Sequence, residues 1–422
     1  MPNDSTAGAP PRRVVITGRG VISPIGSTTA SFWTALLEGR SGVGPITGFD
    51  ASDLPTRIAG EVTDFDPADY MPRLTSRRID RFAQFAVAVA LQAVEEAKLD
   101  LSASPERLRR TGVLLGSGYG PSSLLQESAL KLRDRGHRAV GPYVSAASAI
   151  DSAPGEVALR LGIQGPSGAL STACASGTSA VGEAVRAIRH GYADVMIAGG
   201  SDDAVCPVDI ASACMSRALS RRNDEPQRAS RPFDRARDGF VMAAGAGALV
   251  LESAEHAERR GAQVLAEVVG YGATSDAYHP TAPHPEGAGA REAMRLALAE
   301  AGIGPDDIDH INAHGTSTAL NDRTESESIR AVFGERATQI PISGIKSMTG
   351  HMIGAAGAVE LIATVEAIRT GMVPPTVNCD DPEDASLNYV PHHPQLHATT
   401  YAMSNSFGFA GHNAVLVVRA WS

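Results

Sequence analysis

Apolar residues occur along this chain in two patterns, which predict two kinds of secondary structure. Short unbroken apolar runs predict buried strands over residues 13–17, 112–116, 194–198, 248–252, 263–269, 309–312 and 414–418. Apolar positions three or four residues apart predict helices over residues 30–37, 79–97, 290–301 and 359–368. Because strands alternate with helices, the pattern implies an α/β fold with a largely parallel, buried sheet.

The length of the chain, 422 residues, indicates two core-forming units or one large double unit. Each half contains an apolar strand, then a small-residue turn with a polar or reactive residue, then a helix. The charged stretch 252–261 is the predicted joint, which divides the chain into residues 13–255 and 256–422. Residues 1–12 are polar and rich in proline, and we interpret them as a disordered tail.

The charge of the chain restricts its partners. A formal net charge of −10 argues against nucleic-acid binding, which needs a basic surface. No apolar stretch approaches the roughly 18 residues that span a bilayer, so we expect no contact with a membrane. A local basic cluster is either a solvated loop or a dock for an acidic partner. Its members are Arg217, Arg221, Arg222, Arg228, Arg231, Arg235 and Arg237.

The four cysteines, Cys174, Cys206, Cys214 and Cys379, have neither paired nor metal-ligand spacing. We therefore expect no disulfide framework and no metal site, which suits a reducing, cytoplasmic location. Cys174 differs from the others because a helix is predicted to begin directly after it. The free N–H groups and dipole of a helix N-terminus favour a thiolate and can stabilise an oxyanion. The alternative for Cys174 is a small buried core residue.

Two histidines lie in turns that are candidates for a reactive site. His314 follows the predicted strand 309–312 and precedes a turn of small residues, and His351 lies in a glycine-rich turn before a helix. Each histidine alone is more typical of a structural role. Both are placed at strand-to-helix junctions, however, where α/β proteins collect their chemistry.

Four motifs occur in a fixed order: TACASG around Cys174, HGTST with a later glutamate, KSMTGH and NSFGFAG. In this order they resemble the elongating β-ketoacyl-acyl carrier protein synthases of the thiolase superfamily, and the similarity covers essentially the whole chain after residue 12. The resemblance implies a thiolase-like, duplicated five-layer α-β-α-β-α fold. It also implies an acyltransferase that joins an acyl thioester to malonyl-acyl carrier protein by decarboxylative Claisen condensation.

The resemblance assigns roles to the candidate residues. Cys174 would carry the acyl group, and His314 and His351 would donate N–H groups to the enolate that forms when CO2 leaves. Lys346 would pair with a glutamate, here Glu325, and set the electrostatics around His351. The second cysteine required by a coenzyme A-dependent thiolase, one alternative reading, has no match in this chain.

Further positions follow from the same resemblance. The N–H group of Phe409 would complete the oxyanion site, and Phe409 and Phe240 would gate the pocket. The hydroxyls of Thr281, Thr316 and Thr318 would hold a phosphopantetheine arm. Tyr119 would border the acyl pocket, and its bulk predicts a short acyl chain; if the product lengths of Tyr119→Gly are unchanged, that prediction fails.

Partners and pathway are also implied rather than derived. The partner would be acyl carrier protein, whose phosphopantetheine carries the substrates, so no bound cofactor is expected. The chain would form a homodimer or a heterodimer with a chain-length-factor paralogue. A non-catalytic chain-length partner is a further alternative, but it would lack the nucleophile. The sequence Asn321-Asp-Arg-Thr-Glu resembles polyketide synthase α-subunits, so we favour polyketide over fatty-acid synthesis, although KSMTGHMIGAAG resembles the fatty-acid enzymes.

One departure from the family pattern lies in the last motif. Ala410 stands where many relatives have glycine, which predicts a stiffer loop. Ala243 and Ala244 replace a common glycine-acid pair, and the sequence gives no reason for this change.

Overall fold

The fold is that of a computed structural model, which describes residues 11–422. The predicted tail, residues 1–12, lies outside the described residues except for Pro11 and Arg12. The Arg12 guanidinium donates hydrogen bonds to Asp194 Oδ1 (2.8 Å) and to Ser253 Oγ (2.7 Å). These bonds place Arg12 in the folded body. Within residues 11–422, none of the helices is both long and apolar enough to cross a membrane.

Ten strands form one continuous sheet. The first half of the chain contributes β1 (Val14–Ile22), β4 (Thr111–Gly116), β5 (Ser167–Leu170), β6 (Val195–Asp203) and β7 (Ala244–Ser253). The second half contributes β8 (Ala266–Ser275), β9 (His310–Asn312), β10 (Ile342–Ser343), β13 (Tyr401–Gly408) and β14 (His412–Arg419). The order across the sheet is β10-β9-β13-β14-β8-β1-β7-β6-β4-β5.

The two halves repeat one topology. Each begins with the strand at the middle of the sheet, β1 or β8, and its last strand returns antiparallel beside that strand. The remaining three strands of each half are mutually parallel. The halves meet through antiparallel pairing of β1 with β8. The predicted division at residues 255 and 256 falls within α10 (Ala254–Arg259), between β7 and β8, and as a domain boundary it stays a prediction.

The prediction of a largely parallel sheet is wrong, because the sheet is mixed. Antiparallel pairs join β1 to β7, β6 to β7, β8 to β14, β13 to β14 and β1 to β8. Apolar runs identify buried strands but carry no information on strand direction. The connection between β13 and β14 spans only residues 409–411, which is too short for the crossover that parallel pairing requires.

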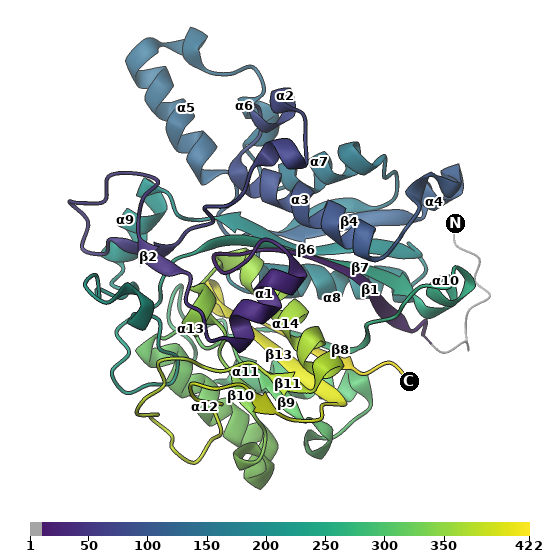
Figure 1. The fold of residues 1–422 in the computed structure, drawn as a ribbon, viewed down its shortest axis with the longest axis vertical. Helices are drawn as coiled ribbons and strands as arrows, with labels where there is room; N and C mark the ends of the chain where they lie inside the picture. Colours follow the sequence, from purple (N-terminus) through teal and green to yellow (C-terminus); the bar gives the residue numbers. More distant parts are fainter. Residues whose placement is uncertain (1–10) are drawn as a thin grey trace.

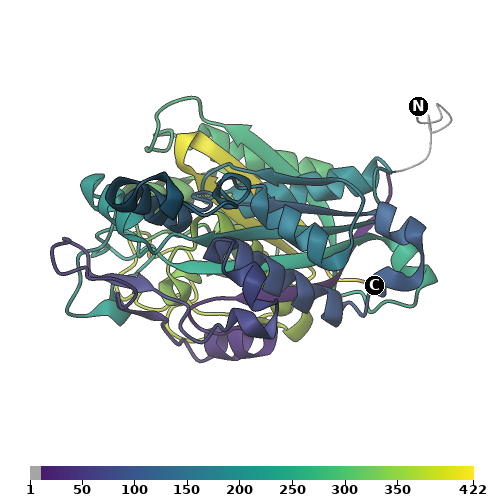
Figure 2. The same cartoon turned by 90° about the horizontal axis from the view of Figure 1, so that it is seen from above.

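Helices divide the molecule into five layers (Figures 1 and 2). The outer face of the first half is covered by α3 (Arg81–Glu96) and α7 (Ser152–Leu161), and that of the second half by α11 (Ala288–Ala301) and α12 (Ala319–Phe333). Between the halves lie α8 (Ser176–Arg189) and α14 (Ala356–Thr370). Because α14 contacts both halves, its residues from 356 to 367 are all buried. The arrangement is α-β-α-β-α, as predicted.

The remaining elements lie around these layers. In Figure 1, α5 (Ser122–Arg135) and α6 (Val144–Ala147) project away from the body of the molecule. The other helices are α1 (Thr29–Leu37), α2 (Arg73–Ser76), α4 (Pro105–Arg109), α9 (Pro207–Met215) and α13 (Lys346–Thr349). Two short hairpin-like sheets pair β2 (Val43–Pro45) with β3 (Ile58–Gly60) and β11 (Met372–Val373) with β12 (Gln395–Leu396).

The carboxyl ends of the parallel strands bring the candidate residues together. In the first half, β4 leads into the loop 117–120 and β5 leads to Cys174. In the second half, β9 ends two residues before His314, and β13 ends directly before Phe409. A site at this edge is what open α/β sheets generally provide.

Candidate active site

Cys174 lies on a sharp turn between β5 and α8. Ala173, directly before it, has a φ of 50°, and α8 begins two residues after it at Ser176. A non-glycine residue at positive φ is strained, and such strain is commonly stored at functional sites. The Cys174 side chain is almost completely buried and faces the interior of a cavity.

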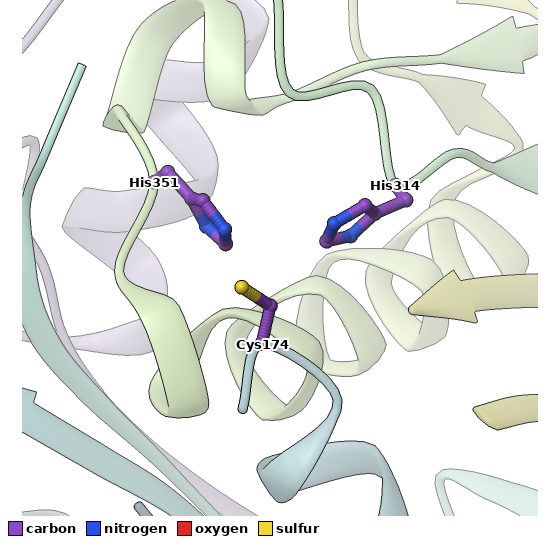
Figure 3. A group of neighbouring side chains, drawn as sticks. All are labelled: Cys174, His314 and His351. Atoms are coloured by element: carbon purple, nitrogen blue, oxygen red, sulfur yellow. The ribbon is translucent and has the colours of Figure 1, made fainter. Parts of the chain in front are cut away.

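Both predicted histidines face the cysteine. Figure 3 shows the Cys174 sulfur and the rings of His314 and His351 pointing toward one another from three separate segments. One atom from each of the three side chains lies within 4.8 Å of the other two. The two imidazole rings are nearly perpendicular, with 5.4 Å between their centroids. The structure therefore brings together the three residues on which the sequence prediction depends.

Burial outweighs the local helix effect at the sulfur. It raises the pKa of the Cys174 thiol to about 11, although the positive charge of Lys346 and N–H groups of Phe409 and Cys174 itself act to lower it. The sequence prediction of a thiolate considered only the helix N-terminus. In the resting protein the sulfur is a thiol, so its proton must leave when the sulfur reacts. The N–H groups of Phe409 and Cys174 both reach the sulfur, which is the arrangement an oxyanion site needs.

The predicted pairing of Lys346 with Glu325 is wrong. Lys346 Nζ forms a buried ion pair with Glu360 of α14. It also donates a 2.6 Å hydrogen bond to the His314 carbonyl and lies 3.3 Å from His314 Nδ1. Lys346 is the first residue of α13, and α14, which carries Glu360, follows α13 closely in the chain. Glu360 is therefore the carboxylate that Lys346 can reach. Its contact is with His314, and its charge also acts on the nearby His351.

Glu325 instead fixes the His314 turn. Its carboxylate accepts hydrogen bonds from the backbone N–H groups of His314 and Gly315, both at 2.8 Å, and from Asn405 Nδ2 at 3.2 Å. Burial raises the pKa of Glu325 to about 7, and those hydrogen bonds oppose the rise. Glu325 thus orients His314 through the backbone and does not face the sulfur.

The ammonium of Lys346 selects the form of His314. Because Lys346 can only donate, Nδ1 of His314 is the acceptor and the ring proton lies on Nε2. Burial and the Lys346 charge hold the pKa of both His314 and His351 well below the usual value. Both imidazoles are therefore neutral. Neither ring nitrogen of His351 has a hydrogen-bond partner among residues 11–422, which leaves both free for a bound molecule.

A cavity of about 550 Å3 connects this group to the surface. Its lining includes every predicted pocket residue: Tyr119, Phe240, Thr281, Thr316, Thr318 and Phe409. Phe240 is buried with its ring edge against His351, whereas Phe409 is 40% exposed. Thr316 and Thr318 share a 3.0 Å hydrogen bond between their hydroxyls. Ala410 has a φ of 59°, a region costly for a residue with a Cβ.

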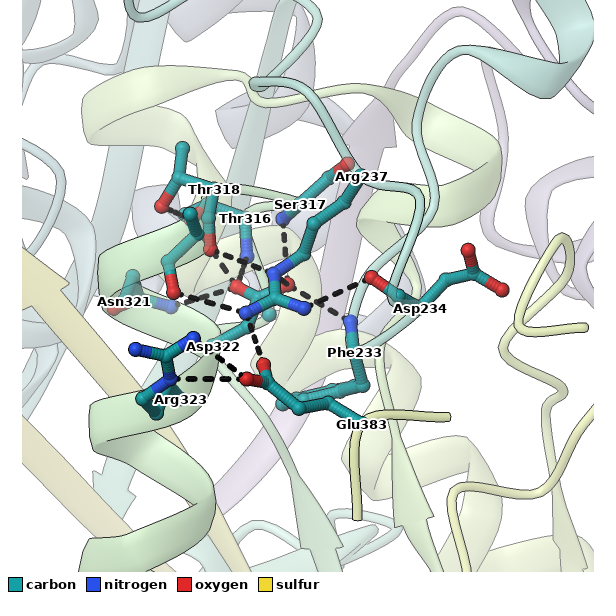
Figure 4. Close-up of polar contacts among 12 residues, drawn as sticks. Phe233, Asp234, Arg237, Thr316, Ser317, Thr318, Asn321, Asp322, Arg323 and Glu383 are labelled. Atoms are coloured by element: carbon teal, nitrogen blue, oxygen red, sulfur yellow. Dashed lines mark hydrogen bonds and ion pairs between the residues drawn. The ribbon is translucent and has the colours of Figure 1, made fainter. Parts of the chain in front are cut away.

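The motif that suggested a polyketide enzyme has a structural role here. Asp322 accepts hydrogen bonds from the backbone N–H groups of Phe233 (2.8 Å), Thr316 (3.0 Å) and Ser317 (3.1 Å) (Figure 4). Arg237 donates to the Thr318 carbonyl at 3.0 Å. The turn that carries the threonine hydroxyls is therefore held by buried charges rather than left free.

The basic cluster predicted from the sequence divides into two groups. Arg231 and Arg237 have buried side chains that pair with Asp234 and with Glu383, so they belong to the interior. The others lie nearer the surface: Arg222 is half-buried, and Arg217, Arg221, Arg228 and Arg235 are exposed. Arg217 also lines the cavity. The exposed arginines keep the prediction of a dock for an acidic partner open.

Sequence reasoning missed two residues that build the site. Glu360 lies on a helix that reads as plainly apolar, and no motif marks it as the partner of Lys346. Asp202 is the second-last residue of β6, and its carboxylate accepts hydrogen bonds from the N–H groups of Gly118 (2.8 Å), Tyr119 (3.0 Å) and Gly354 (2.7 Å). A carboxylate a few residues beyond the apolar run 194–198 was the signal that could have identified Asp202.

We expect Lys346→Met to destabilise the fold. It leaves the Glu360 carboxylate buried without its cation, and breaking a buried pair in this way costs about 3–5 kcal/mol. The double variant Lys346→Met, Glu360→Met should recover most of that loss, because no unpaired charge remains. Urea unfolding of the three proteins measures the difference, and equal stability of the single and double variants would contradict the ion pair.

The duplicated five-layer fold, with a Cys-His-His group where its halves meet, defines the class of thiolase-like ketosynthases. The chain matches the family models described as β-ketoacyl synthase N-terminal domain over residues 11–257 and C-terminal domain over residues 265–380. The chain belongs to the β-ketoacyl synthase family. It is 45% identical to 3-oxoacyl-[acyl-carrier-protein] synthase 2 of Synechocystis sp. over 414 residues, 97% of this chain and 98% of that protein. It is also 45% identical to the Coxiella burnetii protein of the same name over 408 residues, 96% of this chain and 98% of that protein.

Solved structures with the same fold include ketosynthases with their partners. One is a type II polyketide synthase acyl-carrier protein in complex with its ketosynthase bound to the hexaketide (TM-score 0.90, 36% identity, 98% of this chain and 100% of that chain). Another is the ishigamide ketosynthase/chain length factor (TM-score 0.91, 37% identity, 98% of this chain and 100% of that chain). These likenesses confirm the predicted thiolase-like fold.

Proposed function

We propose that this protein extends an acyl chain by condensing it with malonyl-acyl carrier protein in a decarboxylative Claisen reaction. One observation carries the proposal. A thiol and two neutral imidazoles lie within 4.8 Å of one another at the inner part of a cavity that opens to the surface. The thiol can hold the acyl group, and the imidazoles can stabilise the enolate.

The first step transfers the acyl group to Cys174. The sulfur attacks the thioester carbonyl, the N–H groups of Cys174 and Phe409 hold the tetrahedral oxyanion, and the carrier thiol departs. The thiol proton of Cys174 passes to the leaving thiolate. His351 suits this transfer because its ring nitrogens are unpartnered within residues 11–422. The products are an acyl-cysteine and a free carrier thiol.

The second step forms the carbon–carbon bond. Malonyl carrier loses CO2, and the electrons of the broken bond form an enolate whose oxygen accepts hydrogen bonds from His314 Nε2 and from His351. The enolate carbon attacks the acyl-cysteine, and the Cys174 thiolate leaves and regains a proton. Neutral imidazoles donate without trapping the enolate as a protonated product, so the depressed pKa values of both histidines suit this role.

The same three side chains also have the spacing of a metal site, so metal binding is the second candidate function. Lys346 opposes it. A fixed ammonium 3.3 Å from His314 Nδ1 repels a cation and keeps a proton on the ring nitrogen that faces the sulfur. We therefore retain the prediction that no metal is required.

Partners and location follow from the same proposal. Acyl carrier protein would deliver substrates on phosphopantetheine, whose polar groups can bond to the hydroxyls of Thr281, Thr316 and Thr318 along the cavity. Arg217, which is exposed and lines the cavity, suits an acidic carrier. The chain would form a homodimer or a heterodimer with a chain-length-factor paralogue, and the ishigamide ketosynthase/chain length factor supports the heterodimer. We place the reaction in the cytoplasm, with no nucleic acid and no membrane involved and no resident cofactor. Service in polyketide rather than fatty-acid synthesis stays a prediction.

Intact-protein mass spectrometry tests the proposal. Incubation with acyl carrier proteins bearing different acyl groups should add one acyl mass, located on Cys174 by peptide mapping. Addition of malonyl carrier should remove that mass and release a β-ketoacyl carrier two carbons longer. A protein acylated from coenzyme A thioesters but not from carriers would instead favour the thiolase alternative, and a protein that never becomes acylated would overturn the proposal.

A further inference from the structure

Tyr119 presents an unused hydroxyl to the cavity. Its ring lines the cavity and packs in the same cluster as Cys174, Phe240 and Ile353. The Tyr119 hydroxyl makes no hydrogen bond within residues 11–422. Another largely buried tyrosine, Tyr389, bonds through its hydroxyl to Ser326 at 2.8 Å. A phenol in an apolar pocket normally finds such a partner, so the partner of Tyr119 is expected to come from a bound molecule.

The loop that carries Tyr119 is rigidly held. Asp202, completely buried, accepts hydrogen bonds from Ser117 Oγ (2.6 Å) and from the N–H groups of Gly118, Tyr119 and Gly120. The same carboxylate binds the N–H group of Gly354, in the segment after His351. Asp202 thus joins the tyrosine loop to the histidine segment. The backbone of Tyr119 is therefore held in place relative to the histidine segment, as the backbone of a residue that selects substrates must be.

The surroundings of Tyr119 are not those of a purely hydrocarbon slot. Buried Asp209 lies close to the phenol and accepts a 2.9 Å hydrogen bond from the Cys206 thiol. Burial, together with the charges of Asp209 and other acidic groups, raises the pKa of Tyr119 well above its ordinary value. The phenol therefore keeps its proton at any physiological pH and can donate a hydrogen bond to a substrate oxygen.

We infer that Tyr119 selects oxygenated acyl chains: its hydroxyl donates a hydrogen bond to a carbonyl or hydroxyl oxygen of the chain held on Cys174. The inference rests on the proposed function and adds a substrate class to it, β-oxygenated acyl thioesters rather than saturated ones. It is separate from the predicted effect of side-chain size. Removal of the ring tests size, and removal of the oxygen alone tests recognition.

Tyr119→Phe removes only the oxygen. The kcat/KM for Cys174 acylation is measured with β-oxo-octanoyl and octanoyl groups on acyl carrier protein, which differ only in the β-oxygen. We expect the variant to lose about tenfold with the β-oxo donor relative to octanoyl, equivalent to one hydrogen bond of about 1.4 kcal/mol. Tyr389→Phe, which loses a hydroxyl outside the cavity, is the matched control and should not change the ratio of the two donors.

An unchanged ratio between the two donors in Tyr119→Phe would overturn the selection by Tyr119. An equal loss with both donors would make the phenol a packing group, and no loss with either donor would leave its hydroxyl without a role. Failure of the proposed function looks different, because the unmodified protein would then form no Cys174 adduct with either donor.

Discussion

Cys174→Ala should abolish chain extension while leaving decarboxylation of malonyl carrier measurable. Among the cavity-lining residues within 11–422, Cys174 is the only cysteine, and its thiol is the group that holds the acyl chain, so its loss should lower condensation by about 10^4-fold or more. Decarboxylation needs donors for the enolate oxygen, and His314 and His351 remain in the variant. Radiolabelled malonyl carrier measures both quantities, as released CO2 and as β-ketoacyl product.

The matched control for this experiment is Cys379→Ala. Cys379 is equally buried but belongs to the core of the second half and does not line the cavity. Its replacement should keep condensation within about twofold, since it removes one sulfur atom from a core away from the chemistry. If Cys174→Ala still forms the carbon–carbon bond, the covalent step is wrong and the acyl group must transfer directly between carriers.

The architecture was predictable wherever it depends on local apolar pattern. The runs at 112–116 and 414–418 became β4 and β14, and the periodic stretch 79–97 became α3. Two further elements gave no such signal. Helix α5 buries none of its residues in this chain, so it has no apolar stripe to detect. Strand β13 contains the polar run Ser404-Asn-Ser406, which the sheet buries completely.

The candidate site shows where sequence reasoning must stop. Motif order identified Cys174, His314 and His351, which lie in the turns that follow β5, β9 and α13 and which the fold brings together. It could not choose the carboxylate for Lys346, since Glu325 and Glu360 are both within a short length of chain and only the packing of α14 decides between them. Motif order also could not predict the pKa of the Cys174 thiol. A helix N-terminus is a local feature, whereas burial of the sulfur depends on every segment that packs around it.

We expect His314→Ala to lose decarboxylation of malonyl carrier and to keep acylation of Cys174. His314 presents only Nε2–H to the cavity because Lys346 occupies its Nδ1, so it can stabilise the enolate but cannot take the thiol proton. Its removal should lower decarboxylation by about 10^2–10^3-fold, the usual cost of one such donor. Acylation of Cys174 should persist, because the oxyanion donors and His351 remain. Mass spectrometry of the adduct and CO2 release separate the two steps.

A control and a pH profile make the His314 assignment sharper. His310→Leu removes another fully buried histidine, one that does not line the cavity, and should leave decarboxylation unchanged per folded molecule.

The folded pKa of His314 is depressed below the ordinary 6.5, so the ring stays neutral as the pH falls through 6.5. Decarboxylation should therefore show no acid limb there. The free energy of unfolding should fall as the pH drops below 6.5, because the unfolded histidine then gains a proton and the buried ring does not. Two results would contradict this role of His314. One is an acid limb at pH 6.5 in the folded enzyme, and the other is a loss of acylation in His314→Ala equal to the loss of decarboxylation. Either would mean that His314 works as a base on the sulfur rather than as a donor to the enolate.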